Sequence, residues 1–236
     1  MALRSYSRSF FPQIGTDAEG NVFEPERGTQ YEIGVKADIN DRLSATLAFY
    51  NLTRTNVLTT DPDDERFSVQ TGEQRSRGIE FDVSGEILPG WNIVAGYALT
   101  DAEITEDNFF EEGNQLAGIP RHTFNLWTTY EIQSGDLQGL GFGLGLFYVD
   151  NRQGDLENTF ELPSYFRTDA ALFYNRDNFR IALNISNLFN VDYFLSANAD
   201  NPRLGVHPGD PFTIRHLRNR NNFDKILITM NFANPK

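Results

Sequence analysis

Hydrophobic and polar residues alternate along most of this chain. In residues 179–186, Ile181, Leu183 and Ile185 occupy every second position, with small or polar residues between them. Side chains of a β-strand change face at every residue, so this period predicts strands with one apolar and one polar face. The same period recurs in about ten segments, and no helical period competes with it over a long window.

The connections between these segments alternate between short and long. Short turns are predicted near residues 41, 89, 136 and 176. Long polar loops are predicted at residues 11–28, 59–66, 106–120, 150–163 and 195–210. Because successive connections of an antiparallel sheet lie at opposite ends, all long loops are expected at one end and all short turns at the other.

Two all-β architectures fit this pattern, a soluble β-sandwich and a transmembrane β-barrel. The strands are about 10–15 residues long, whereas globular strands usually have ~5–6. The loops are sorted by length, and aromatic residues such as Trp91, Tyr130 and Tyr174 stand at strand ends. These features favour an antiparallel transmembrane β-barrel segment, with the apolar face toward lipid and every backbone group paired by a neighbouring strand.

Composition excludes several other classes of protein. The chain has 236 residues, a net charge of −13 and no cysteine. The acidic balance argues against nucleic-acid binding through a basic surface, and the missing cysteines exclude disulfides and thiolate metal sites within these residues. No run of about 18 apolar residues predicts a transmembrane helix, and no signal-peptide pattern follows Met1.

The candidate chemistry does not indicate an enzyme. His122, His207 and His216 lie far apart in the sequence, and there is no nucleophile–base pair or metal-ligand spacing. The acidic run 61–65 contains the oxygen ligands that Ca²⁺ prefers, but a solvated surface loop is the better interpretation.

The polar face of the strands is expected to line a lumen. It includes Gly141, Gly143 and Gly145, which are interpreted as a site of close packing and not as a phosphate-binding loop. The charged residues expected to form pairs on this face are Lys36, Arg54, Glu80, Asp82, Asp169 and Arg180.

Six segments resemble, in order, the C-terminal barrel of TonB-dependent siderophore receptors. They are FFP at 10–12, FEPERGTQYEIGVK at 23–36, QRSRGIE at 74–80, LPGW at 88–91, PRH at 120–122 with LWTTY at 126–130, and NLFNVDY at 187–193. Each segment is short, so the resemblance rests on their common order. It implies a 22-strand outer-membrane barrel that is filled by an N-terminal plug domain, energised by the TonB complex and used to import ferric siderophores.

The resemblance also implies that residues 1–236 are the C-terminal portion of such a barrel. The plug domain, the TonB-contacting segment, the signal peptide and the first dozen strands would then be absent. Residues 216–236 read as an atypical tail, because the family ends on an aromatic closing strand that the barrel-assembly machinery recognises. In this chain a basic, polar run begins at His216.

A siderophore site is implied at the long-loop end, where aromatic rings stack on the chelate and Arg, Gln and Tyr donate hydrogen bonds to it. The candidate residues are Phe10, Phe11, Phe109, Phe110, Tyr148, Arg152, Gln153 and His207. Loop packing is the competing interpretation for each of them. No cofactor and no protein ligand to iron are expected, because the iron arrives already chelated.

Two other functions remain open from the sequence. A passive porin-like channel would lack the plug, and a soluble β-sandwich binding module would lie outside the membrane. Within the family, the loops decide the ligand, so vitamin B12 or another nutrient can replace the siderophore. The resemblance places the protein in the outer membrane, with lipid, the TonB complex and the barrel-assembly machinery as further partners.

Overall fold

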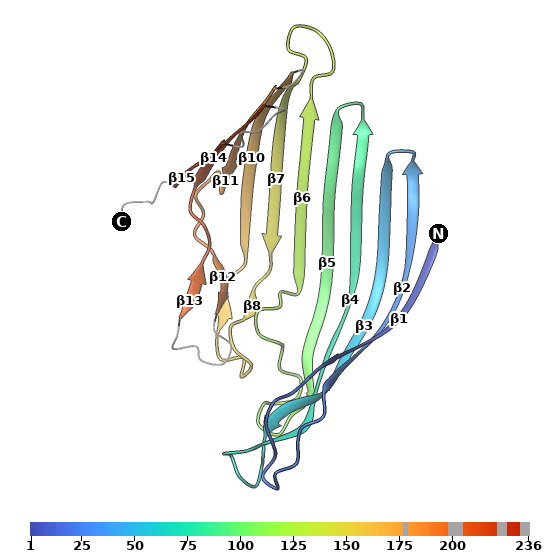
Figure 1. Ribbon diagram of the computed structural model, residues 1–236, viewed down its shortest axis with the longest axis vertical. Helices are drawn as coiled ribbons and strands as arrows, with labels where there is room; N and C mark the ends of the chain where they lie inside the picture. Colours follow the sequence, from blue (N-terminus) through green and yellow to red (C-terminus); the bar gives the residue numbers. More distant parts are fainter. Residues whose placement is uncertain (177–178, 198–204, 221–225, 232–236) are drawn as a thin grey trace.

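The computed structural model describes residues 1–176, 179–197, 205–220 and 226–231 of the chain. They form one curved sheet of 11 antiparallel strands, accompanied by two small two-stranded sheets (Figure 1). The large sheet contains β1 (Ala2–Phe11), β2 (Glu26–Asn40), β3 (Leu43–Thr60), β4 (Ser68–Leu88), β5 (Trp91–Glu106), β6 (His122–Glu131), β7 (Leu140–Val149), β10 (Tyr165–Arg176), β11 (Phe179–Ser186), β14 (Thr213–Arg220) and β15 (Ile226–Asn231). The small sheets pair β8 (Arg152–Gln153) with β9 (Glu161–Leu162), and β12 (Phe194–Ala197) with β13 (Val206–Pro208). None of the described residues belongs to a helix long and apolar enough to cross a membrane.

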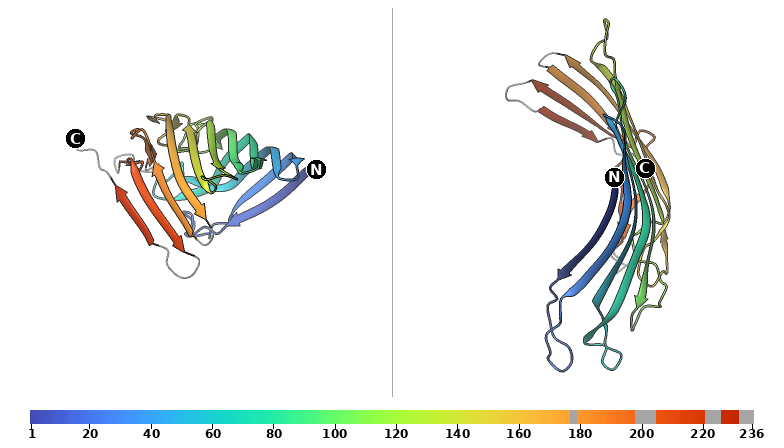
Figure 2. Two further views of the ribbon diagram at one scale, coloured as in Figure 1. Left: turned by 90° about the horizontal axis from the view of Figure 1, so that it is seen from above. Right: turned by 90° about the vertical axis from the view of Figure 1, so that its right-hand side faces the viewer.

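Strand order in the large sheet follows chain order, so each of its strands pairs with the next strand that belongs to the same sheet. The sheet is a single layer that curves across its width (Figure 2). Its strands reach 21 residues in β4, which confirms the predicted long strands. The all-β, antiparallel barrel-segment prediction is therefore confirmed, and the one-layer sheet does not have the two facing layers of a sandwich.

The long connections gather at one end of the sheet, at the bottom of Figure 1, as the sequence predicted. We name them loop A (12–25), loop B (61–67), loop C (107–121), loop D (150–164) and loop E (187–212), and refer to them together as the rim. Loop A is shorter than the predicted 11–28, because β1 and β2 keep pairing until Phe11 lies opposite Glu26.

The apolar face carries two rows of aromatic residues. The row nearer the rim runs across four neighbouring strands as Tyr97, Phe124, Tyr148 and Phe166. The row nearer the short turns contains Trp91, Tyr130 and Phe142 on consecutive strands. Along β7 the two rows are six positions apart, from Phe142 to Tyr148, or roughly 20 Å at the rise of a strand. This spacing suits the apolar band of an outer-membrane barrel, which is about 25 Å tall between its aromatic girdles.

One polar contact supports the row nearer the short turns. The indole Nε1 of Trp91 donates to the Thr128 hydroxyl at 2.8 Å, and this hydroxyl donates to the Asn92 carbonyl. We expect Trp91→Phe to lower the free energy of unfolding by about 0.5–1.5 kcal/mol, because an aromatic ring remains at this position but the indole N–H donor is lost. Urea unfolding of the reconstituted barrel measures this loss. Thr128→Val should destabilise the Trp91→Phe variant less than it destabilises the parent protein. Equal losses of stability in both backgrounds would contradict the bond.

The polar face is closely packed at the glycines of β7. A Cβ atom on Gly143 would lie 3.0 Å from the Trp127 ring, and one on Gly141 would lie 2.2 Å from the Phe173 ring. The two aromatic side chains therefore lie over the glycine row, as the close-packing interpretation predicted. Beside them is a hollow of about 420 Å³. It is lined by Gly90, Asn92, Trp127, Thr129, Glu131, Ala171, Phe173, Asn175, Arg180, Ala182 and Asn184.

The last two strands lie in the region that the sequence marked as atypical. β14 continues through His216 to Arg220 and is paired with β11 over this length. On its other side β14 pairs with β15, from Thr213 opposite Asn231 to Arg218 opposite Ile226. The predicted tail 216–236 thus begins inside a paired strand. Residues 221–225 and 232–236 lie outside the described residues.

Candidate functional site

The most deeply buried side chains of the described residues gather toward the rim. Ile104, Asp155 and Asn187 are each 1% exposed, and Arg152 is 3% exposed. A one-layer sheet offers little burial elsewhere, because each of its faces is open. The rim is thus the part of the described structure that has a packed interior, although it consists of loops and strand ends.

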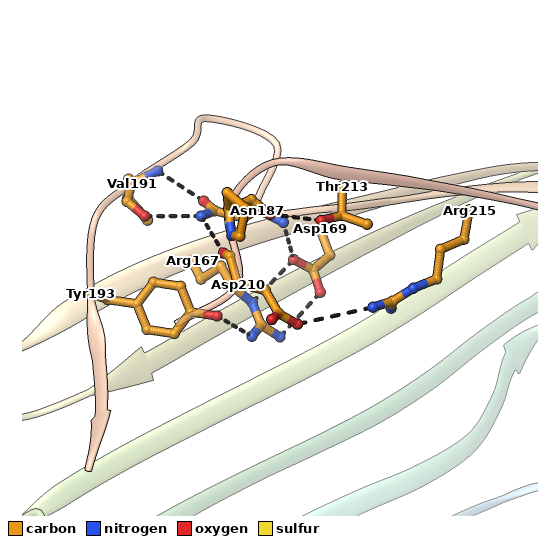
Figure 3. Close-up of polar contacts among 9 residues, drawn as sticks. Arg167, Asp169, Asn187, Val191, Tyr193, Asp210, Thr213 and Arg215 are labelled. Atoms are coloured by element: carbon orange, nitrogen blue, oxygen red, sulfur yellow. Dashed lines mark hydrogen bonds and ion pairs between the residues drawn. The ribbon is translucent and has the colours of Figure 1, made fainter. Parts of the chain in front are cut away.

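Asn187 shapes the point where β11 gives way to loop E (Figure 3). Its φ of 52° is left-handed, a conformation that asparagine tolerates better than most residues. Its Nδ2 donates to the carbonyls of Val191 at 2.9 Å and Asp210 at 3.0 Å, and its Oδ1 accepts from the Val191 N–H at 2.9 Å. One buried side chain therefore holds both the start and the end of loop E.

The Asn187 turn is joined to the polar face of the sheet through Asp169. The Asp169 carboxylate accepts the Asn187 N–H at 2.8 Å and pairs with the Arg167 guanidinium at 3.1 Å. Arg167 also donates to the Tyr193 hydroxyl at 3.2 Å and lies 4.5 Å from the centre of the Phe147 ring. Figure 3 shows Arg167 and Asp169 of β10 beside Asn187 and Tyr193 of loop E.

A second cation, Arg152, lies beside the ring of Tyr165, which in turn packs on Tyr193. Tyr193 packs on Tyr165 with ring centres 4.6 Å apart, and the Arg152 guanidinium lies 5.8 Å from the centre of the Tyr165 ring. Arg152 Nη2 donates to the carbonyls of Phe194 at 2.6 Å and Leu195 at 3.1 Å. Burial lowers the pKa of Arg152 from its ordinary value, while the neighbouring Tyr165 acts in the opposite direction. Arg152, Tyr165, Tyr193 and Arg167 thus form a continuous cluster of contacts that joins loop E to loop D and β10. We call it the stack.

The eight predicted ligand-contact residues lie on several separate elements of the rim. Phe10 and Phe11 end β1 and are 74% and 65% exposed. Phe109 and Phe110 lie in loop C, with their rings edge to face at 5.1 Å. Gln153 belongs to β8, where its Nε2 donates to Glu161 at 3.3 Å, and the exposed His207 belongs to β13.

Two of the eight residues are placed differently from the rest. Tyr148 belongs to the apolar-face row that includes Phe124 and Phe166, so its ring points away from the polar face. Arg152 is buried and directed at the carbonyls of loop E. From these positions Tyr148 is suited to the aromatic girdle of the barrel, and Arg152 is suited to holding a loop.

Sequence reasoning missed the stack formed by Tyr165, Arg167 and Tyr193. It did place Asp169 on the polar face, and the structure agrees. The available signal was the change of rhythm after Ser186, where alternation stops and the segment NLFN follows at 187–190. Its two asparagines, Asn187 and Asn190, have positive φ angles, which explains why the strand period cannot continue.

The described part of the chain contains no group of three or more His, Asp or Glu side chains arranged to hold a metal ion. In particular, Asp61 in the acidic run of loop B accepts the N–H of Asp63 at 2.8 Å, as in an ordinary turn.

Comparison with protein families identifies the type of barrel to which this sheet belongs. The family model for the TonB dependent receptor-like β-barrel matches residues 1–188. The chain belongs to the TonB-dependent receptor family. It is 40% identical over 198 residues to the ferrichrome outer membrane transporter/phage receptor of Escherichia coli (strain K12), covering 81% of this chain and 26% of that protein. It is 38% identical over 208 residues to the metal-pseudopaline receptor CntO of Pseudomonas aeruginosa (strain UCBPP-PA14), covering 87% of this chain and 29% of that receptor.

Solved structures of TonB-dependent receptors superpose on the same sheet. The siderophore receptor PiuA from Acinetobacter baumannii has a TM-score of 0.77 at 30% identity, covering 89% of this chain and 32% of that one. The ferric-catecholate import receptor Fiu from E. coli K12, in its closed form, has a TM-score of 0.76 at 28% identity, covering 91% of this chain and 32% of that one. This chain therefore spans between about a quarter and a third of the length of the relatives that it matches.

Membership of this family confirms several of the sequence predictions. The apolar face is the outer surface of an outer-membrane barrel, and the polar face lines its lumen. The family consists of transport receptors, so the prediction that the chain is not an enzyme is also confirmed.

Proposed function

We propose that this chain is part of a receptor that binds a ferric siderophore at the rim and imports it with energy from the TonB complex. The observation that supports this most strongly is the 40% identity to a ferrichrome transporter, which extends over 81% of the chain. Binding at the rim fits the exposed aromatic residues Phe10 and Phe11, at the end of β1 beside loop A, and Phe109 in loop C. No bond is made or broken in this mechanism.

The contact residues that we propose at the rim are Phe10, Phe11, Phe109, Phe110, Gln153 and His207. Their aromatic rings would stack on the organic part of the chelate, and the amide and imidazole would hydrogen-bond to it. For Tyr148 and Arg152 we propose supporting roles, since the first lies on the apolar face and the second is buried beneath loop E.

A second ligand class has a specific observation in its favour. The 38% identity to a metal-pseudopaline receptor extends over 87% of the chain, a coverage similar to that of the ferrichrome transporter. Siderophores and other metallophores are both chelates too large for passive diffusion through a small pore. The same receptor architecture therefore suits either cargo, and the loops decide between them.

An uptake assay tests this proposal. We expect deletion of the gene to abolish uptake of one radiolabelled chelate among ferrichrome, ferrioxamine B, a ferric catecholate and a metal–pseudopaline complex, and complementation to restore it. Uptake should also stop when TonB is deleted or the proton-motive force is collapsed. Gene-dependent uptake that persists without TonB would support the passive channel instead, and unchanged uptake of all four chelates on gene deletion would overturn the proposal.

A further inference from the structure

One hydrogen-bonding device recurs three times at the rim. In each case a side-chain carboxamide accepts the N–H and donates to the C=O of one and the same residue, as a neighbouring strand would. We call this arrangement an amide bracket. The pairs are Gln70 with Glu24, Asn158 with Gln115, and Asn187 with Val191.

The first amide bracket joins loop A to β4, at the residues that follow loop B. The Glu24 N–H donates to Gln70 Oε1 at 2.7 Å, and Gln70 Nε2 donates to the Glu24 carbonyl at 2.5 Å. The two residues are 46 positions apart in the sequence. A peptide group in loop A is thus fixed by a side chain that loop A does not contain.

Loop C is tied to the ends of β3 and β4, the two strands that loop B connects, by a different set of polar side chains. The buried Thr59 hydroxyl donates to Asp107 at 2.7 Å, and the same carboxylate oxygen accepts the N–H groups of Phe109 and Phe110. Asn108 adds a bond from its Nδ2 to the Thr71 hydroxyl at 2.9 Å. These contacts hold loop C against the strand ends on both sides of loop B, and they orient its phenylalanine pair.

The second amide bracket joins loop C to loop D. The Gln115 N–H donates to Asn158 Oδ1, and Asn158 Nδ2 donates to the Gln115 carbonyl, both at 2.9 Å. Asn114 Nδ2 donates to the Leu156 carbonyl, also at 2.9 Å. Asn158 has a φ of 57°, so its backbone already adopts a conformation that suits asparagine better than most residues.

Loop D is tied to loop E by the buried Arg152. Its two bonds to the carbonyls of Phe194 and Leu195 fix the backbone of β12 against β8. Loops A and C are therefore fastened to the strand ends that flank loop B, loop C is fastened to loop D, and loop D is fastened to loop E.

We propose that these fastenings make the rim a preformed collar, in which Gln70, Asp107, Asn158 and Arg152 position the loops before a ligand arrives. Loops are ordinarily the most mobile parts of a fold, because their backbone groups bond mainly to water. Here peptide groups of loops A, C and E bond to side chains of a neighbouring strand or loop, so opening one of these loops breaks bonds to that neighbour. The role of the collar in ligand binding rests on the proposed function, whereas the existence of the collar does not.

Distance measurements between spin labels test the collar without any ligand. The chain contains no cysteine, so Glu112→Cys in loop C and Glu157→Cys in loop D can be labelled specifically. Pulsed electron–electron double resonance on the receptor in outer-membrane vesicles should give one narrow distance distribution. Asn158→Asp keeps the shape of the side chain but places an oxygen against the Gln115 carbonyl, and we expect it to broaden the distribution at least twofold.

The matched control is Asn92→Asp, an exposed residue at the short-turn end of β5, which makes the same charge change without touching an amide bracket. It should leave the distribution unchanged. If Asn158→Asp assembles poorly, Asn158→Gly removes both bonds and tolerates the positive φ, so it should broaden the distribution too. A broad distribution before any substitution at Asn158, or a width that neither variant changes, would overturn the collar.

The fastening of loop E is tested in the same way. With labels at Glu157→Cys and Val206→Cys, Arg152→Met should broaden the distribution of distances between loops D and E. Arg66→Met in loop B should leave this distribution unchanged. Equal widths for both variants would show that Arg152 does not position loop E. Absence of chelate uptake would overturn the proposed function but would not change the widths of the distance distributions, which are measured without ligand. Failure of the proposed function and failure of the collar are therefore distinguishable.

Discussion

Asn187→Ala is expected to lower the free energy of unfolding by about 3–5 kcal/mol, the largest single-residue effect outside the membrane band. The substitution removes three hydrogen bonds of a side chain that is 1% exposed, and it leaves an alanine, which tolerates a left-handed φ of 52° less well than asparagine does. Loop E would lose a buried group that joins its start to its end. Urea unfolding of the receptor purified from outer membranes measures the loss.

Two further variants separate the causes of this effect. Asn187→Gly loses the same bonds but tolerates the positive φ, so it should be more stable than Asn187→Ala by about 1 kcal/mol. Asn184→Ala, on the polar face of the same strand, should cost less than about 0.5 kcal/mol. If Asn184→Ala and Asn187→Ala destabilise the protein equally, the Asn187 turn has no special role in holding loop E.

Leu144→Arg is expected to cost about 2–4 kcal/mol of folding free energy in lipid bilayers. Leu144 lies on the apolar face of β7, between the two aromatic rows, where a guanidinium would meet hydrocarbon without a partner. The folded fraction in bilayers, read from the faster migration of unheated barrels in denaturing gels, gives the change in stability. A Leu144→Met variant should remain close to the parent protein.

The lumen-side control for this experiment depends on the structure. Sequence alternation alone suggests Gly143→Arg, but a side chain there would press on the Trp127 ring at 3.0 Å. Asn184→Arg is a better control because Asn184 lines the polar hollow, where a long cation has space and water. If Asn184→Arg proves more destabilising than Leu144→Arg, the assignment of the two faces is reversed.

The strands could be predicted from the sequence because their signal is local. Every second residue of a strand shares its environment, so the period survives without knowledge of the partners. The same period placed Tyr148 with Leu144 on the apolar face, whereas its position at a strand end suggested a ligand contact. The structure places Tyr148 in the aromatic row, so the period was the better guide to this residue.

The fastenings of the rim could not be predicted because their partners are remote and have no period. Gln70 and Glu24 are 46 positions apart, and Asn158 and Gln115 are 43 positions apart. In a sequence, an asparagine in a polar loop looks the same whether it faces water or brackets a peptide group. The buried Arg152 was predicted as a contact residue for the same reason, since arginine in a loop is ordinarily exposed.

The sequence by itself determined the strands, their apolar and polar faces, the sorting of long loops to one end, and the family. Each of these follows from patterns that neighbouring residues share, and lipid on one face enforces them over the whole sheet. Only the tertiary structure decided which loop residues are buried and what they hold. A loop has no repeating environment, so the role of Asn158 or Arg152 is set by whichever distant peptide group the fold brings within 3.1 Å of it.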